Sequence, residues 1–282
     1  MMKRYWTWVA GAPSKRSPRS VDHSGASAQA GRLRHPAFIL LSLTLSIILG
    51  CQNKEEENLE NTEPSNTSAQ LSTESAFAEQ LQAIADGTSG SIVITKERVT
   101  SEQFQQLQPH AERIEKIEII RAELDPSDFD LLATFNNLNW LRLDIPIDDT
   151  ALSSIAQCQS LRILNLPQGQ FTDQPLEAIS KLKRLELFRF HSPNVTDAGM
   201  KQIANLPKLK YLHLLEVPIT DAGLIPFHDR HDLQSFYLDG SKVTDDGLRA
   251  LLKANPELHL HRDQLHLPED PLGKEHEQGG TP

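Results

Sequence analysis

The chain has 282 residues, 38% of them hydrophobic, and its 28 basic and 38 acidic residues give a formal net charge of −10. Residues 1–50 contain seven of the bases and one of the acids, so the remainder carries 21 bases against 37 acids, a net charge of −16. Nucleic acids and anionic lipid surfaces are bound through basic patches, which so acidic a chain is poorly suited to provide. We therefore predict neither nucleic-acid binding nor purely electrostatic attachment to a membrane.

Residues 1–50 have the features of a leader that ends in a secretory signal. The apolar run from Ala37 to Gly50 follows Arg32 and Arg34 and is 14 residues long, which is short for a membrane span of about 20 residues but suits a signal peptide. Its end, Ile48-Leu49-Gly50-Cys51, resembles a bacterial lipobox. The resemblance implies that Cys51 is the lipid attachment site and that the protein is lipid-anchored in the cell envelope. An uncleaved anchor and an organellar transit segment are the alternatives.

Residues 51–74 are predicted to form a disordered tether, because they are rich in Glu, Asn, Ser and Thr and contain few large apolar residues. In bacteria with two membranes, the Gln52 that follows the cysteine favours the outer membrane, facing the periplasm or the exterior. Residues 75–89 are predicted to form an N-terminal capping helix, since Phe77, Leu81 and Ile84 share one helical face and Gly87 follows them.

The middle of the chain contains a repeated segment of about 24 residues. Its phase is marked by five leucines at spacings of 23, 24, 24 and 24 residues: Leu138, Leu161, Leu185, Leu209 and Leu233. Each begins the pattern L-x-x-L-x-L or a Phe variant of it, and a Thr-Asp-x-Gly signature follows, most clearly at Thr196, Thr220 and Thr244. Such a period predicts one unit stacked many times, because a single unit cannot bury its own apolar face.

Within each unit the apolar spacing changes from two to about 3.6 residues, which predicts a strand, a turn and a helix. Thr and Asp suit the start of the helix, where a hydroxyl accepts a bond from a backbone N–H and a carboxylate complements the helix dipole. The predicted strands are Ile92–Ile94, Ile117–Ile119, Leu141–Leu143, Leu164–Leu166, Phe188–Phe190, Leu212–Leu214 and Phe236–Leu238, with a candidate eighth at Leu258–Leu260.

Stacked strands lie about 4.8 Å apart whereas packed helices need about 8–10 Å, so the stack must bend with its parallel sheet on the concave side. The strand pattern and the I-T-D-x-G-L signature resemble the leucine-rich repeat family, in its ribonuclease-inhibitor-like, cysteine-containing subclass. The resemblance implies an α/β solenoid over residues 90–262, a right-handed arc of about seven or eight repeats. Residues 263–282 are predicted to be a polar tail. Cys158 fits the subclass and is predicted to be a buried core residue.

The residues that alternate with the core leucines are predicted to face outwards on the concave sheet in three columns. Trp140, Ile163, Leu187 and Tyr211 form an apolar stripe in the first column, beside Arg and His residues in the other two. In the eighth strand we place His259 in the middle column and His261 in the last. The predicted partner-binding residues are Trp140, Arg142, Ile163, Asn165, Leu187, Arg189, His191, Tyr211, His213, Tyr237 and Asp239.

An apolar stripe with Trp, Tyr and Arg is typical of a recognition surface, so we predict that the concave face binds a protein or peptide. Two alternatives remain open. The stripe could be covered by the tether or tail or contribute only cross-strand packing, or the array could be a structural, self-associating component of the cell envelope.

Metal binding and catalysis are not predicted. His191 and His213 are expected on neighbouring strands, and His259 and His261 on one face near Asp239, so a histidine-rich metal surface is a remote alternative. However, no fixed ligand motif such as H-E-x-x-H occurs, and we predict no metal or cofactor. The sequence also contains no G-x-S-x-G, phosphate-binding loop or C-x-x-C motif, which argues against an enzyme.

Overall fold

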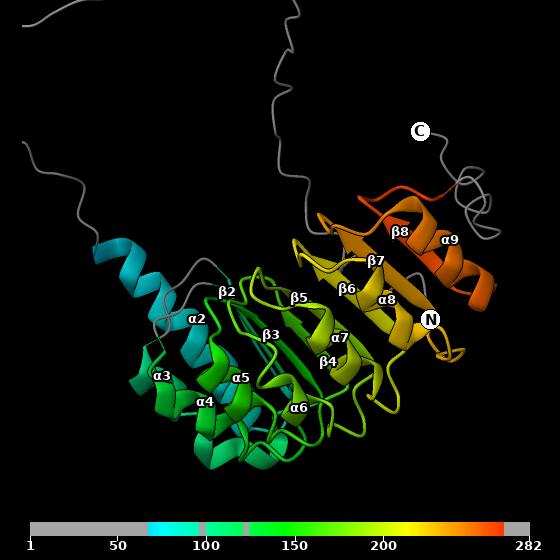
Figure 1. Cartoon of the computed structure of the whole chain (residues 1–282). Helices are drawn as coiled ribbons and strands as arrows, with labels where there is room; N and C mark the ends of the chain where they lie inside the picture. The colour runs from blue at the N-terminus through cyan, green and yellow to red at the C-terminus, as the bar shows by residue number, and fades with distance from the viewer. Residues whose placement is uncertain (1–66, 96–99, 121–123, 268–282) are drawn as a thin grey trace, which may run out of the picture. The chain divides into compact units, whose positions relative to one another are not determined.

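A computed structural model describes residues 67–95, 100–120 and 124–267 (Figure 1). The predicted leader, the lipid attachment site Cys51, the first part of the tether and the tail from residue 268 onwards lie outside these residues. No helix in the described part of the chain is both long enough and apolar enough to cross a membrane.

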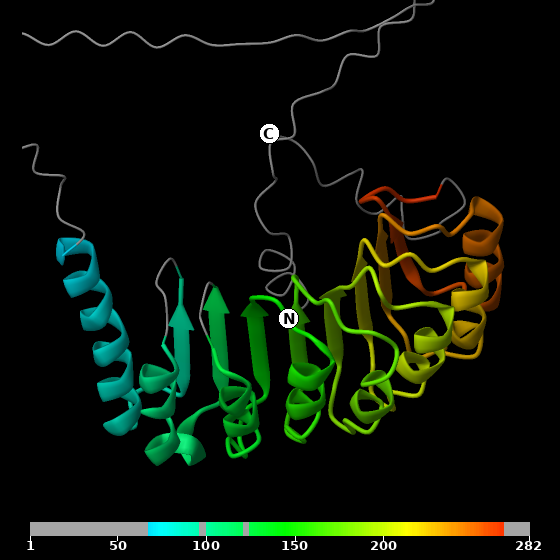
Figure 2. The same cartoon turned by 60° about the vertical axis from the view of Figure 1, so that its left-hand side comes forward.

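Eight parallel strands form one sheet in which each strand pairs with the next in sequence (Figure 2). The strands are β1 (Ser91–Ile94), β2 (Lys116–Ile120), β3 (Trp140–Asp144), β4 (Ile163–Leu166), β5 (Leu187–His191), β6 (Tyr211–Leu215), β7 (Ser235–Asp239) and β8 (His259–Arg262). The first seven contain every strand residue predicted from the repeat and extend it by one residue at one or both ends. The predicted solenoid is therefore confirmed.

Short helices connect the strands and lie along the outer side of the sheet (Figure 2). They are α3 (Ser101–Gln105), η1 (Gln108–Arg113), α4 (Pro126–Leu132), α5 (Asp149–Ile155), α6 (Leu176–Ile179), α7 (Asp197–Ala204), α8 (Asp221–Leu224), η2 (Ile225–Phe227) and α9 (Asp245–Ala254). The core lies between the two layers, and all five phase leucines are buried in it. Cys158 is buried there as predicted, and burial raises the pKa of its thiol to about 12.

The Thr-Asp-x-Gly signature joins each repeat to the next. The hydroxyl of Thr220 accepts a hydrogen bond from Ala222 N of its own helix, which confirms the predicted cap. The carboxylate of Asp197, in the preceding repeat, accepts hydrogen bonds from Thr220 N at 2.8 Å and from its Oγ1 at 2.6 Å. The same pairs recur as Asp149 with Thr172, Asp173 with Thr196 and Asp221 with Thr244.

This Asp–Thr ladder also explains the glycine of the signature. A Cβ at Gly223 would lie 2.6 Å from Asp197 Oδ1, so only glycine leaves room for the carboxylate of the preceding repeat. The ladder ends at Asp245, for which no further repeat follows. Its Oδ1 instead pairs with Arg262 Nη1 at 2.6 Å.

The N-terminal cap begins earlier than predicted. Helix α2 spans Thr67–Ala85, so the tether does not extend to residue 74 and the helix does not begin at residue 75. No proline or glycine lies between Thr67 and Ala85 to interrupt a helix. Gly87, with φ of 73°, follows the end of the helix as expected.

A side chain from α2 covers the free edge of β1. The Gln80 amide donates to Val93 O at 3.0 Å and accepts from Val93 N at 2.7 Å, in the manner of a neighbouring strand. These two bonds satisfy edge groups that would otherwise be open to another chain.

The C-terminal end continues beyond the predicted boundary at residue 262. After β8 the chain turns back, and Arg262 and Leu265 pair as an antiparallel bridge with two hydrogen bonds of 2.9 Å. Leu267 is buried against the core. The repeat domain and its cap therefore extend to Leu267, because Leu260 before the turn and Leu267 after it are both buried.

The columns predicted for His259 and His261 in the last strand are also wrong, each by one column. His259 pairs with Ser235 and His261 with Tyr237, which places them in the first and middle columns. The 24-residue spacing in fact continues into the last strand, since Leu260 pairs with Phe236 and His261 with Tyr237, so Leu258–Leu260 was the wrong choice for the inward-facing pair. Arg262 consequently occupies an inward position, which an edge strand tolerates because its charged head reaches Asp245.

Candidate functional site

The predicted apolar stripe lies across four consecutive strands of the concave sheet. Trp140 pairs in register with Ile163, Ile163 with Leu187, and Leu187 with Tyr211. Parallel neighbours lie about 4.8 Å apart, so the four side chains stand next to one another. All four are partly buried rather than fully exposed. The stripe thus presents a continuous apolar surface.

A chain of polar contacts, which we call the polar row, runs beside the stripe from β4 to β7. Arg189 Nη1 donates to Asn165 Oδ1 at 3.1 Å and its Nε donates to His213 Nδ1 at 3.2 Å. Because Nδ1 accepts from arginine, the proton of a neutral imidazole lies on Nε2, which donates to Asp239 Oδ2 at 2.9 Å. The sequence predicted these four residues separately, and the structure brings them together.

Burial and neighbouring charges shift the pKa values of His213 and Asp239 in the polar row. Burial lowers the pKa of His213, with the hydrogen bond to Asp239 opposing this change and the charge of Arg189 adding to it. Burial would raise the pKa of Asp239, but the hydrogen bond and the charge of His213, with that of Arg189, hold it below its usual value. The row therefore places the imidazole of His213 between a guanidinium and a carboxylate.

A second group of charges lies at the N-terminal side of the stripe. Arg142 pairs with Glu118 at 3.0 Å and lies 3.7 Å from Asp144, and Lys116 lies 3.2 Å from Glu118. The Lys116 ammonium also lies 4.9 Å from the ring centroid of Trp140, in a cation–π contact. Glu118 is 1% exposed, although its column was predicted to face outwards, because these two cations cover it.

His191 and Tyr237 have different places on this face. His191 Nδ1 lies 2.9 Å from Gly169 O, and its Nε2 lies 3.5 Å from Glu216. Tyr237 was predicted to contact a partner but is only 9% exposed. Its ring is stacked on His261 with centroids 4.4 Å apart and touches His213 at 5.3 Å. These rings cover Tyr237, so its predicted exposure is corrected.

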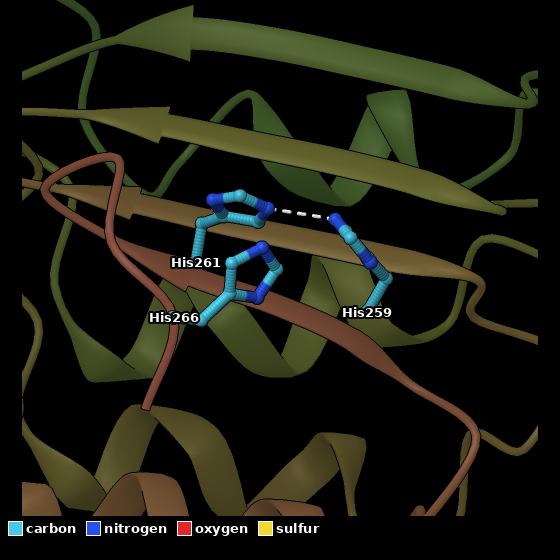
Figure 3. Close-up of side chains that lie close together, drawn as sticks. All are labelled: His259, His261 and His266. Atoms are coloured by element: carbon cyan, nitrogen blue, oxygen red, sulfur yellow. Dashed lines mark hydrogen bonds between the residues drawn. The ribbon is translucent and has the colours of Figure 1, made fainter. Parts of the chain in front are cut away.

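The structure adds a third histidine to the pair that the sequence had placed on one face. His259 and His261 share a face of β8, and His266 joins them from the returning segment (Figure 3). In the described part of the chain, they are the one group of three or more His, Cys, Asp or Glu residues close enough to hold a metal ion. His266 was missed because the residues beyond the last repeat carry no repeat pattern. The alternation of Leu260-His261 and His266-Leu267 around Asp263-Gln264 was a usable hairpin signal.

No protein-family model matches the chain, and no curated protein matches it. Among solved structures, it is similar to an internalin C2 from Listeria monocytogenes, with 22% identity, a TM-score of 0.50 and coverage of 69% of this chain and 87% of that one. Weaker similarities link it to PEPR1–AtPEP1 (14% identity, TM-score 0.40, coverage 61% and 28%) and to an internalin, inlF, from Listeria monocytogenes (13%, 0.35, 70% and 90%). The internalin C2 similarity shows a shared fold.

Proposed function

Because the chain folds as a leucine-rich repeat solenoid, we propose that it binds a protein or peptide partner on the concave face of its sheet. The observation that carries this proposal is the in-register apolar stripe of Trp140, Ile163, Leu187 and Tyr211. Aromatic residues and arginine supply much of the binding energy at protein interfaces, and Arg142 and Arg189 lie in the adjacent column. The partner would present apolar side chains to the stripe.

The polar side chains beside the stripe are already held in place by their neighbours, which supports the same proposal. Asn165 and Asp239 hold Arg189 and His213 through the hydrogen bonds of the polar row, and Glu118 and Asp144 hold Arg142. Side chains that are already ordered lose less conformational entropy when a partner binds. The parallel sheet beneath them is a rigid base for such a surface.

The test compares affinity capture from cell-envelope extracts by three forms of the protein: the wild type, the double variant Trp140→Ala/Tyr211→Ala and the control Ile225→Ala. Ile225 is an apolar residue of η2, 62% exposed and away from the concave sheet. We expect a partner identified by mass spectrometry to be retained by the wild type and the control and lost by the double variant. The melting temperature of the double variant should change little, since its two rings are outside the core.

A partner retained by all three forms would contradict the proposal. Concentration-dependent sedimentation of the purified protein, abolished by the double variant, would show instead that the stripe binds a second copy of the chain. That outcome would favour a self-associating component of the envelope over a receptor for another protein.

We further propose that the protein is secreted and tethered to the cell envelope through a lipid on Cys51. The support is the sequence Ile48-Leu49-Gly50-Cys51 after a 14-residue apolar run. Several acyl chains on one terminus would anchor it firmly, since each buried CH₂ contributes about 0.8 kcal/mol. The variant Cys51→Ser should shift the protein out of the membrane fraction and remove the lipid mass from its N-terminal peptide. An unchanged membrane fraction would contradict the tether.

A further inference from the structure

The histidine cluster of His259, His261 and His266 lies at the C-terminal end of the sheet (Figure 3). One ring nitrogen of each residue lies within 4.8 Å of those of the other two. His259 Nε2 and His261 Nε2 are 2.6 Å apart, and the ring centroids of His261 and His266 are 3.9 Å apart. Three imidazoles from two chain segments thus converge on one small volume.

The backbone explains why they converge. His259 and His261 are two residues apart on β8, so their side chains leave the same face of the strand. Asp263 and Gln264 have φ values of 51° and 66°, the left-handed pair required by a tight two-residue hairpin. With Arg262 opposite Leu265, the same register places His266 opposite His261 and Leu267 opposite Leu260. The leucines face the core, and the histidines face the concave side together.

The surroundings hold the rings in place. His261 is stacked on Tyr237 with an interplanar angle of 18°, and the His259 ring lies 6.0 Å from that of Tyr237. All three histidines are partly buried. A site of this kind loses little side-chain entropy when a ligand arrives, and it remains accessible from solvent.

We propose that His259, His261 and His266 bind one zinc ion and that this ion locks the C-terminal hairpin onto the edge of the sheet. Three neutral imidazoles with an open fourth position are a typical zinc donor set, whereas magnesium and calcium require oxygen ligands. Zinc–nitrogen bonds of about 2.0–2.1 Å in tetrahedral geometry place the nitrogens about 3.3 Å apart. The distance between the His259 and His261 nitrogens would increase slightly to reach this spacing, and the longer nitrogen–nitrogen distances in the cluster would shorten.

Zinc at this position would act on the stability of the cap. The cluster joins β8 to the segment after the turn, and that segment buries Leu267 and covers the last strand. Since the unfolded chain does not hold the three imidazoles together, zinc would bind the folded cap preferentially and raise the melting temperature. This effect is independent of any partner on the apolar stripe.

The experiment is a zinc titration of the purified full chain after treatment with a chelator and dialysis, followed by calorimetry and by measurement of bound metal. We expect one zinc ion per chain and a rise in melting temperature with zinc. The variants His266→Gln and His259→Gln should weaken zinc binding by more than about 100-fold. Loss of a residue that only hydrogen-bonds a metal ligand already costs about 10–100-fold in affinity, and these variants remove a ligand itself. The matched control His191→Gln, on the same sheet face but outside the cluster, should bind zinc as the wild type does.

Two further measurements separate loss of the metal site from loss of the fold. Near-ultraviolet circular dichroism of each variant without metal checks that the fold is kept, and His261 is left unchanged because it also supports Tyr237. Cobalt(II) in place of zinc should give the visible absorption typical of tetrahedral coordination, and His266→Gln should abolish it. Absence of saturable zinc binding by the wild type, or equal binding by His266→Gln, would overturn the proposal and leave the cluster as a hydrogen-bonded cover for Tyr237.

Discussion

At the scale of single residues, one carboxylate per repeat has two structural tasks. Asp197 and Asp221 each lie in the first turn of their own helix and also accept two hydrogen bonds from the Thr of the next repeat. Hydrogen bonds to a charged acceptor contribute more than neutral ones. The Asp–Thr ladder is therefore a stabilising contact between repeats that a helix-capping interpretation of the sequence does not include.

Replacing Asp197 with Ala should lower the free energy of unfolding by about 1–3 kcal/mol, since Thr220 loses both hydrogen bonds to the carboxylate. Urea unfolding followed by circular dichroism measures this. The matched control Asp246→Ala removes an acid that is 93% exposed and outside the ladder, so its change should stay within about 0.5 kcal/mol. Equal losses for the two variants would show that the ladder adds no stability.

Gly223→Ala tests the steric part of the same contact. The added methyl group would press on Asp197 Oδ1, so the substitution should destabilise the protein although Ala is the better helix former. In the background of Asp197→Ala the same change should cost clearly less. A double-mutant cycle by urea unfolding measures the coupling, and strictly additive losses would contradict the close approach.

His213 should make stability depend on pH. Burial lowers its pKa below the ordinary value of 6.5, so the unfolded chain takes up a proton that the folded chain does not. The contribution of His213 to stability is therefore complete above about pH 6.5 and is lost as the pH falls from there towards the folded-state pKa. Unfolding measured between pH 7.5 and pH 5 should show a smaller loss for His213→Gln than for the wild type; parallel curves would refute this.

At the scale of elements, the two edges of the sheet are covered by different means. Helix α2 covers β1 and contributes Gln80, whose amide bonds both backbone groups of Val93. At the other end the turn at Asp263-Gln264 folds the chain back beside β8. Both devices occupy strand edges that would otherwise pair with another chain.

Gln80→Ala should lower the free energy of unfolding by about 1–3 kcal/mol, because two backbone groups at a part-buried edge lose their partners. It should also promote association at high concentration, visible by light scattering. Gln82→Ala is the control, since Gln82 lies on the same helix but bonds only Asp86 at the surface. If Gln80→Ala behaves as Gln82→Ala does, then the helix covers the edge without help from this amide.

At the scale of the whole molecule, stability is distributed along the repeat domain. The main helix contacts join neighbours in the array, α6 to α7, α7 to α8 and α8 to α9, and each strand pairs only with the strands beside it. In such a stack each repeat depends on its neighbours rather than on a single central core.

Truncating a buried leucine should therefore have a local effect first. Leu212, which is 1% exposed in β6, should cost about 2–5 kcal/mol when replaced by Ala, because a cavity remains in the core. Hydrogen exchange followed by mass spectrometry should show β5, β6 and β7 losing protection before β2 and β3. Uniform loss of protection along the array would contradict this view.

Most of the fold followed from the repeat itself. The period of about 24 residues and the alternation within L-x-L set the strands, their parallel register and the columns from β2 to β7, because these features depend on contacts within one unit and with the next. The stripe residues Trp140, Ile163, Leu187 and Tyr211 could be named for the same reason.

The ends of the array and the contacts between columns were decided only by the tertiary structure. A turn without a repeat pattern brought His266 to His259 and His261, and the rings of His261 and His213 covered Tyr237. The Asp–Thr ladder and the polar row likewise join residues about 24 positions apart through side chains. Periodicity determines whether a side chain faces the core or the concave side. Its contacts depend on which residues the stacking brings next to it, and beyond the last repeat the pattern no longer predicts these neighbours.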